Sequence, residues 1–250
     1  MKQFTVLSHN VFWFQGVPFL TDKPPAANKE VMKRLCALYQ KIDADVICLQ
    51  EIQNKETLEA VAQQMGMMSC YCPGTALTQY GGGLLWRHDR GTPTRNSQGS
   101  AVETQRMWQT LEVPGANSSI RIGNVHLPSS RQLGQERANA QRLAELEALI
   151  GSVEGGLDII VGDFNEWPDG PVGNCLERHG YVDSAVLLGR TEVPTLLGDH
   201  RGDYAWVKRQ MSGRVLRYDV LGKESLAGNV ADKHYLSDHL PLWITVEETK

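Results

Sequence analysis

The 250-residue sequence has no hydrophobic run that approaches the roughly 18 apolar residues needed to cross a membrane. Its first ten residues, Met1 to Asn10, carry one lysine and too short an apolar stretch for a signal peptide. An exported chain from which a leader had been removed would begin in the same way. We therefore expect a soluble cytoplasmic protein whose apolar content is sufficient for a globular core.

Positive charge is also scarce. The formal net charge is -4, and no stretch is rich in lysine and arginine. Proteins that coat duplex DNA through phosphate contacts are usually basic, so the charge balance argues mildly against that class. A local basic groove that binds short or single-stranded nucleic acid remains compatible with an acidic average.

The five cysteines are an odd number and lack the spacing of a disulfide framework or a zinc motif. The closest pair, Cys70 and Cys72, is separated by one residue rather than by the two of a C-x-x-C motif. No paired set of cysteines and histidines accompanies it. We expect reduced thiols, as in a cytosolic protein, and no metal or redox centre at Cys70 and Cys72.

Hydrophobic periodicity predicts short buried strands and two main helices. Apolar residues recur at helical spacing from Val31 to Ile42, after an N-cap residue at Asn28, and again within residues 132–150. Apolar runs such as residues 45–51 and 157–161 are typical of buried strands. Strict strand–helix–strand crossovers are few, which favours an α+β fold of two packed sheets with helices outside. Because the chain has no repeat and no linker, we expect one domain over residues 1–250.

The most informative string is Gly162-Asp163-Phe164-Asn165, which directly follows the second of those apolar runs. Side chains two apart in an extended segment point the same way, so Asp163 and Asn165 converge on one point. A carboxylate beside a carboxamide suits a hard cation, or a water molecule held next to a phosphoryl oxygen. The alternative is an Asx-rich turn, which is what most such strings form.

Other residues able to bind a metal or transfer a proton stand at the ends of predicted strands. Taken singly, each has an ordinary explanation: a helix cap for Glu51, a hydrogen-bonded core histidine for His126, a turn residue for Asp238. Because strand ends gather at the rim of a sheet, the residues together predict one site. The candidate set is Asn10, Glu51, His126, Asp163, Asn165, Asp203, Asp238 and His239.

A series of short motifs carries a wider resemblance. In chain order they are Asn10, Leu49-Gln50-Glu51, Asn124-Val125-His126, Gly162-Asp163-Phe164-Asn165, Asp203-Tyr204 and Ser237-Asp238-His239-Leu240-Pro241. The series resembles the endonuclease/exonuclease/phosphatase superfamily, the deoxyribonuclease I-like group of metal-dependent phosphoesterases. The resemblance implies a four-layer α/β/β/α sandwich with two mixed, mostly antiparallel sheets and outer helices. Two residues depart from the family pattern: His9, where an aromatic residue is usual, and Gly202, where an aliphatic residue is common.

The metal-binding role falls first on Glu51, because Mg²⁺ is usually held by one or two carboxylates with water and substrate oxygens. By the resemblance, Asn10 and Asp238 lie near the same ion, and Mn²⁺ would substitute for Mg²⁺. Asp163 is expected to orient the attacking water, and Asn165 to donate to a phosphoryl oxygen.

The proton-transfer role is assigned jointly to Asp163 and His239. A histidine base needs a partner that orients its ring, and Asp203 is expected to fill that position, with Asp219 as the alternative. His126, best as an imidazolium, would bind a non-bridging phosphate oxygen.

These residues predict a divalent-metal phosphoester hydrolase in which water attacks phosphorus in line. We expect a phosphodiesterase or phosphatase acting on a small or lipid-type phosphoester, and a monomer. A DNA or RNA nuclease is the alternative, and a catalytically inactive binding module on the same fold is the second. The loops at residues 15–27, 87–106 and 188–202 are expected to determine the substrate, and their shape does not follow from the sequence.

Overall fold

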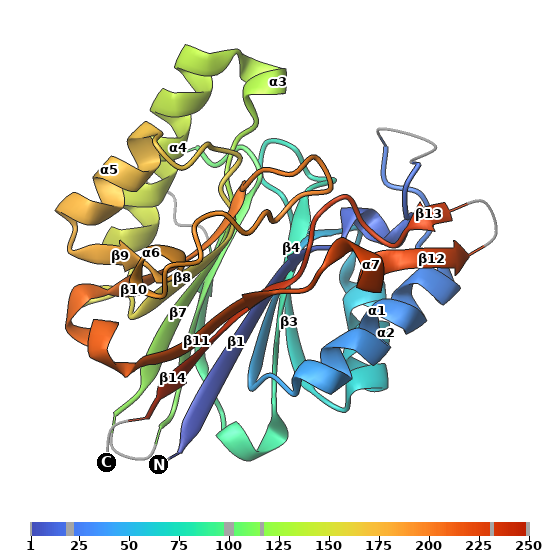
Figure 1. The fold of residues 1–250 in the computed structure, drawn as a ribbon, viewed down its shortest axis with the longest axis horizontal. Helices are drawn as coiled ribbons and strands as arrows, with labels where there is room; N and C mark the ends of the chain where they lie inside the picture. The colour runs from blue at the N-terminus through green and yellow to red at the C-terminus, as the bar shows by residue number, and fades with distance from the viewer. Residues whose placement is uncertain (1, 19–22, 98–102, 116–117, 231–232, 249–250) are drawn as a thin grey trace.

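A computed structural model describes residues 2–18, 23–97, 103–115, 118–230 and 233–248. Two six-stranded sheets form its centre, and helices cover their outer faces (Figure 1). In spatial order the first sheet contains β11 (Val215–Val220), β14 (Leu242–Glu247), β1 (Gln3–Asn10), β2 (Val46–Ile52), β4 (Gly81–Trp86) and β3 (Met68–Cys72). The second contains β5 (Thr94–Ser97), β6 (Met107–Val113), β7 (Ile120–His126), β8 (Ile159–Asp163), β10 (Asp203–Lys208) and β9 (Tyr181–Asp183). A separate hairpin pairs β12 (Ala227–Val230) with β13 (Lys233–Tyr235).

The helices flank the two sheets on opposite sides, α1 and α2 beside the first sheet and α4 and α5 beside the second (Figure 1). The α-helices are α1 (Lys29–Ile42), α2 (Lys55–Met65), α3 (Ser130–Leu133), α4 (Gln135–Gly151), α5 (Pro171–Arg178), α6 (Ser184–Leu187) and α7 (Lys223–Leu226). Short 3-10 helices are η1 (Phe12–Phe14), η2 (His88–Arg90) and η3 (Arg209–Arg214). None of the helices in the described ranges is long and apolar enough to span a membrane. The expected four-layer α+β architecture is confirmed.

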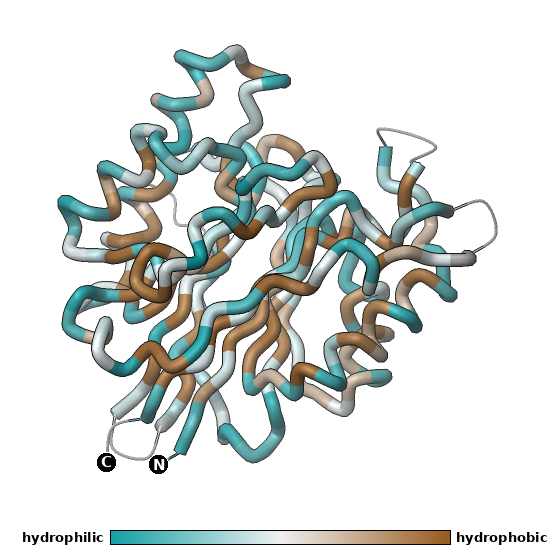
Figure 2. The backbone as a smooth tube through the Cα atoms, in the orientation of Figure 1, coloured by the Kyte–Doolittle hydropathy of each residue, from teal (hydrophilic) through white to brown (hydrophobic). Residues whose placement is uncertain are grey.

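The buried apolar residues separate into three clusters, one at each interface between layers. Neighbouring strand residues divide between clusters: Val6 faces the opposite sheet, whereas Leu7 faces α1 and α2. In the same way Val161 lies between the sheets and Ile160 packs under α4 and α5. This two-residue alternation is the pattern of a strand buried on both faces. Figure 2 shows the hydrophobic colour gathered on the central strands, with hydrophilic segments on the outer turns.

Some expected elements differ in their limits. The helix predicted over residues 132–150 is two helices, α3 and α4, because Gly134 between them has a φ of 78° that ends the first helix. Strand β3 was not predicted, since its alternation of sulfur-containing and polar residues lacks a β-branched pattern.

Parallel pairing of strands brings the candidate residues to one edge of the two sheets, which we call the rim. Strand β1 runs parallel to β2, and β7 runs parallel to β8, so each pair presents its carboxyl ends together. In this register His126 is opposite Asp163. Strand β10 is antiparallel to β8 and begins at Asp203, which is also opposite Asp163. The strand ends singled out in the sequence therefore meet at one rim.

Candidate active site

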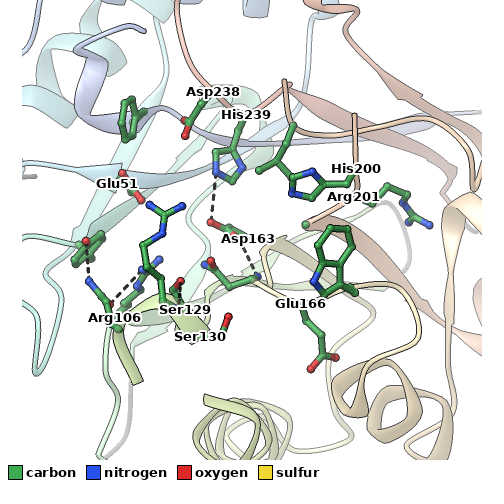
Figure 3. A pocket seen from close by; sticks show the side chains of 18 of the residues that line it. Glu51, Arg106, Ser129, Ser130, Asp163, Glu166, His200, Arg201, Asp238 and His239 are labelled. Atoms are coloured by element: carbon green, nitrogen blue, oxygen red, sulfur yellow. Dashed lines mark hydrogen bonds and ion pairs between the residues drawn. The ribbon is translucent and has the colours of Figure 1, made fainter. Parts of the chain in front are cut away.

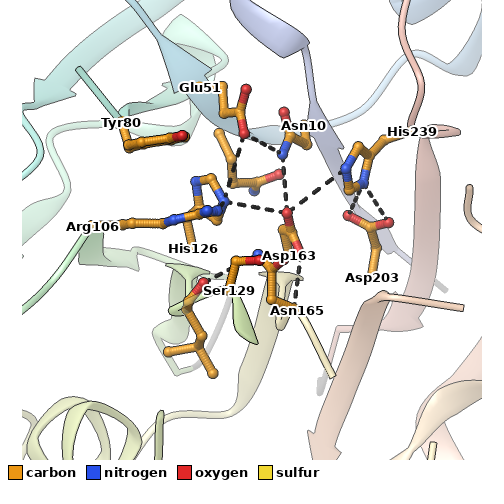
Figure 4. A network of polar contacts seen from close by, with 12 residues as sticks. Asn10, Glu51, Tyr80, Arg106, His126, Ser129, Asp163, Asn165, Asp203 and His239 are labelled. Atoms are coloured by element: carbon orange, nitrogen blue, oxygen red, sulfur yellow. Dashed lines mark hydrogen bonds and ion pairs between the residues drawn. The ribbon is translucent and has the colours of Figure 1, made fainter. Parts of the chain in front are cut away.

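The side chain of Asp163 lies at the centre of a buried polar network (Figure 4). Its Oδ2 accepts a hydrogen bond from Asn10 Nδ2 at 3.0 Å and lies 3.3 Å from His126 Nε2. Its Oδ1 accepts from the backbone N–H of Asn165 at 2.9 Å, as in an Asx-turn. His239 Nε2 lies 3.8 Å from the same Oδ2. Four of the eight candidate residues thus surround the carboxylate of a fifth.

Positive charge around Asp163 keeps this carboxylate ionised. Burial alone would raise its pKa, but the charge of His239, the hydrogen bond from His126 and the charge of Arg106 outweigh it and hold the pKa of Asp163 well below its usual range. An ionised acceptor at this position can hold a water molecule.

His239 and Asp203 form a buried pair, with His239 Nδ1 2.9 Å from Asp203 Oδ2 and 3.1 Å from Oδ1. Burial lowers the pKa of His239, but the carboxylates of Asp203, Asp163 and Asp238 more than compensate, and the net pKa lies well above 6.5. The imidazole ring is therefore charged, with Nδ1 directed at Asp203. The alternative partner, Asp219, lies elsewhere and pairs with Arg190 and Arg217.

Gly162 allows β8 to approach β7 closely enough to form this rim. Its φ is +144°, and a Cβ there would lie 2.0 Å from the carbonyl oxygen of Val125. Only glycine accepts both the conformation and the contact. The glycine of the Gly-Asp-x-Asn string is thus required by backbone packing one residue before Asp163.

Two candidate residues have backbone conformations that non-glycine residues seldom adopt: Glu51 has a φ of 58° and Asn165 a φ of 49°. At Glu51 the pairing of β2 with β4 shifts register between Gln50 and Ile52. Such bulges redirect a side chain out of the strand alternation. The irregularity turns Glu51 toward the site, and such strain is common at functional positions.

Two buried carboxylate oxygens, Oε2 of Glu51 and Oδ1 of Asp238, have no hydrogen-bond partner among the described residues. Both residues line the same cavity as Asp163 and His239 (Figure 3). Burial raises the pKa of Glu51 to about 7, and the charge of Asp238 adds to the rise. Buried acceptors that lack donors and repel each other fit a divalent cation, which would supply the missing positive charge.

A second group of donor atoms lies within reach of one ion. Atoms of Asp163, Asp203 and His239 lie within 4.8 Å of one another. In this structure the histidine Nδ1 is already bonded to Asp203, and Asp163 already accepts hydrogen bonds from Asn10 and Asn165. The unpaired oxygens of Glu51 and Asp238 are therefore the better fit to a metal.

Arg106 is a component of the site that no motif in the sequence indicated. Its guanidinium contacts His126 Nε2 and lies 4.2 Å from the ring centroid of Tyr80. Two backbone contacts hold its segment: Thr75 N–H donates to the Arg106 carbonyl at 2.8 Å, and Gln105 N–H donates to Glu145 Oε1 at 2.8 Å. The loop at residues 87–106 was expected only to shape the substrate site, yet its last residue adds a cation to the network.

His126 differs from expectation in its charge. It is completely buried, and burial together with the charge of Arg106 lowers its pKa to about 4. The ring is neutral at physiological pH, so the cation beside the network is Arg106 rather than an imidazolium at His126. A positive charge on His126 would be repelled by the adjacent guanidinium of Arg106, because both groups are buried in a region of low dielectric constant.

The network opens into a cavity of about 490 Å³, within the range of small-molecule sites. Its mouth carries Trp167, which is 62% exposed and lies with its ring centroid 4.7 Å from that of His200. Arg131 also lines this cavity. Arg201 also borders the cavity, but its guanidinium is bound to Asp183 at 2.7 Å.

The fold and the site define a class, the metal-dependent enzymes that hydrolyse phosphoesters. The chain belongs to the Endonuclease/Exonuclease/phosphatase family, whose model matches residues 7–239. The match covers nearly the whole chain, as the motif series implied. No curated protein sequence matches the chain significantly.

Solved structures of the same fold align with almost the full chain. Danio rerio TDP2 in complex with a single-stranded DNA product has a TM-score of 0.75 at 16% identity, covering 99% of this chain and 100% of that one. A mannosyl-6-phosphatase of Bacteroides thetaiotaomicron has a TM-score of 0.73 at 14% identity, covering 98% and 100%. The human Nocturnin catalytic domain with bound sulfate has a TM-score of 0.72 at 19% identity, covering 99% and 94%. At these identities the likeness concerns the fold.

Proposed function

We propose that the protein is a Mg²⁺-dependent phosphoester hydrolase in which a water molecule attacks phosphorus in line. The observation that carries this proposal is the pair of unpartnered buried carboxylate oxygens on Glu51 and Asp238, in one cavity with the Asp163–His239–Asp203 network. Asn10 would complete the metal-binding set. Its amide already donates to Glu51 Oε1 at 3.2 Å, which directs the carboxylate.

The charges of the resting site support a division of the proton-handling roles between Asp163 and His239. Asp163 is ionised and Oδ2 faces His239, so it accepts a hydrogen bond from the attacking water and receives its proton. His239 is charged, so Nε2 donates a hydrogen bond to a phosphoryl oxygen, while Asp203 keeps the ring oriented through Nδ1. The two residues thereby divide the role that the sequence assigned to them jointly.

The remaining residues stabilise the negative charge that develops on phosphorus. A divalent cation held by Glu51 and Asp238 would neutralise phosphoryl oxygens. Arg106, anchored beside His126, provides a second positive group at the same wall of the cavity. Asn165 Nδ2 donates to the Leu127 carbonyl at 3.1 Å, which orients the side chain and leaves its second N–H for a phosphoryl oxygen. Donors fixed before the reaction reduce the cost of reorganisation.

The cavity volume of about 490 Å³ favours a small or lipid-type phosphoester as the substrate. A nuclease activity on short or single-stranded nucleic acid is the second candidate. It is supported by Trp167, whose exposed ring beside His200 offers a face for stacking a base.

The test is hydrolysis by the metal-free full chain of bis-p-nitrophenyl phosphate, p-nitrophenyl phosphate and a single-stranded oligonucleotide, with and without Mg²⁺ or Mn²⁺. We expect turnover only with metal, and a loss of several orders of magnitude in Asp163→Ala and His239→Ala. Asp219→Ala, which removes a carboxylate outside the cavity, is the matched control and keeps full activity. Turnover in excess chelator would refute the metal, and no turnover of any of the three would favour a binding module.

We also propose a reducing compartment, the cytoplasm, for this enzyme. All five cysteines are free thiols, and four of them, Cys36, Cys48, Cys72 and Cys175, are buried.

A further inference from the structure

Outside the active site, three side chains of different chemistry converge between α4 and α5. They are Glu147 on α4, and Cys175 and His179, which lie on and just after α5. Glu147 Oε2 is 2.9 Å from His179 Nε2, and Glu147 Oε1 accepts a hydrogen bond from Cys175 Sγ at 3.4 Å. One donor atom from each of the three lies within 4.8 Å of the other two. None of the three lines the active-site cavity.

The helix spacing explains the convergence. Cys175 and His179 are four residues apart, so they project from the same face of α5, toward α4. His179 follows directly after the helix, where its backbone N–H still bonds to the Cys175 carbonyl at 3.1 Å. A thiol, an imidazole and a carboxylate are thereby held by two packed helices rather than by a loop.

The distances suit a tetrahedral transition-metal ion. With a Zn–S bond of about 2.3 Å and Zn–N and Zn–O bonds of about 2.0–2.2 Å, neighbouring ligand atoms lie roughly 3.3–3.8 Å apart. The His179–Glu147 and Cys175–Glu147 contacts, 2.9 and 3.4 Å, are close to that range and need only small outward shifts. The side chains of His179 and Glu147 are 36% and 52% exposed, so an ion can enter from solvent and keep a water molecule.

We propose that Glu147, Cys175 and His179 form a Zn²⁺ site that pins α5 to α4, with water as the fourth ligand. The ligand set favours Zn²⁺ over Mg²⁺, because thiolate and imidazole are ligands of borderline and soft ions, whereas Mg²⁺ takes oxygen. Binding forms a zinc–sulfur bond and releases the thiol proton to solvent. Carboxylate and thiolate then carry two negative charges that balance the ion, while the imidazole stays neutral.

The position of the cluster fits a structural role. The Cys175 thiol donates to Glu147 Oε1 at 3.4 Å, so the sulfur and the carboxylate already face each other across the two helices. At its first turn α5 is tied to the active-site segment, because Val172 N–H donates to Glu166 Oε2 at 2.7 Å and Glu166 lines the cavity. The ion would therefore stabilise the helix pair that supports this segment.

The test uses Co²⁺ as a spectroscopic substitute for Zn²⁺ on the full chain. Thiolate bound to Co²⁺ gives a charge-transfer absorption in the near ultraviolet, and no cysteine lines the described active-site cavity, so the band reports this site alone. We expect the band to saturate at one equivalent of Co²⁺ and to be displaced by Zn²⁺. It is expected to vanish in Cys175→Ser and persist in Cys70→Ser, the matched half-buried control.

A thermal measurement keeps the proposal testable if Cys175→Ser folds poorly. Zn²⁺ added in the presence of saturating Mg²⁺ is expected to raise the Tm of the wild type. The rise is expected to be lost in His179→Asn and Glu147→Gln, which alter partly exposed side chains, and Co²⁺ affinity to fall at least tenfold in both. The proposal is overturned if the wild type gives no thiolate band, if the band survives in Cys175→Ser, or if His179→Asn retains the full Zn²⁺-dependent rise.

Discussion

Replacement of Gly162 by alanine tests how closely the two strands of the active-site rim must pack. The added Cβ would lie 2.0 Å from the carbonyl oxygen of Val125, whereas real contacts of this kind stay beyond 3.0 Å. Strands β7 and β8 must therefore separate by about 1 Å, and the residue must also keep a φ of +144°. Overpacking of about 1–3 kcal/mol and backbone strain of about 1–3 kcal/mol together predict a loss of roughly 2–6 kcal/mol. That loss is a large part of a typical stability of about 5–15 kcal/mol.

The variant Gly66→Ala separates the contribution of backbone strain from that of overpacking. Gly66 has a φ of +64° at the end of α2, and a Cβ there meets nothing within 4 Å, so only conformational strain of about 1–2 kcal/mol applies. Urea unfolding of both variants and the wild type gives the two free-energy differences, and we expect Gly162→Ala to cost more. Because Asp163 is the next residue, a displacement of about 1 Å is also expected to reduce kcat about 100-fold, whereas Gly66→Ala leaves it unchanged.

The outcome that refutes this reasoning is specific. If Gly162→Ala unfolds at the same urea concentration as Gly66→Ala and turns over substrate like the wild type, the Val125 carbonyl contact does not require glycine. If Gly162→Ala is as stable as Gly66→Ala but has lost activity, the strands have instead shifted locally and displaced Asp163.

Three charged residues give further tests. Burial raises the pKa of Glu145 to about 7, so the folded protein keeps a proton that the unfolded chain releases near 4.5. Relative to Glu145→Gln, the wild type is expected to lose up to about 3 kcal/mol of unfolding free energy as pH rises from 4.5 to 7, and nothing more above pH 7. Urea unfolding at several pH values measures this difference, and the same pH dependence in both proteins would contradict the prediction. Arg142→Ala leaves Glu166 without its buried cation at 3.5 Å and is expected to lower the free energy of unfolding by about 3–5 kcal/mol. The double variant with Glu166→Gln is expected to recover part of this stability, and no recovery would contradict a charge effect. Arg106→Ala is expected to lower kcat/KM on a diaryl phosphodiester about 100- to 1,000-fold, and wild-type kinetics would remove this residue from the catalytic network.

Much of the candidate site could be located from local patterns. An apolar run that ends in Gly-Asp-x-Asn specifies a buried strand with polar side chains at its end, and this holds for β8. The alternation of Ile160 and Val161 between two clusters follows from the two-residue period of a strand. Helix α1 begins where Asn28 caps the backbone N–H groups of Glu30 and Val31, as the sequence predicted.

Other features depended on neighbours that are remote in the chain. Arg106 has no motif, and its place beside His126 results from contacts with α4 and with residues 75–77. Burial and, after it, the adjacent charge of Arg106 lower the pKa of His126 and keep the imidazole neutral, and both depend on the tertiary structure. The sequence favoured Asp203 and left Asp219 as the alternative, and the pairing of β10 with β8 places Asp203 beside His239.

The sequence by itself determined which segments form buried strands and where those strands end in polar side chains. These properties depend on the residue and its immediate neighbours. Only the tertiary structure decided which charges meet: Arg106 with His126, His239 with Asp203, and Glu147 with Cys175 and His179. The physical reason is that electrostatic energies depend on distance and burial, and both are set by contacts between segments far apart in the chain.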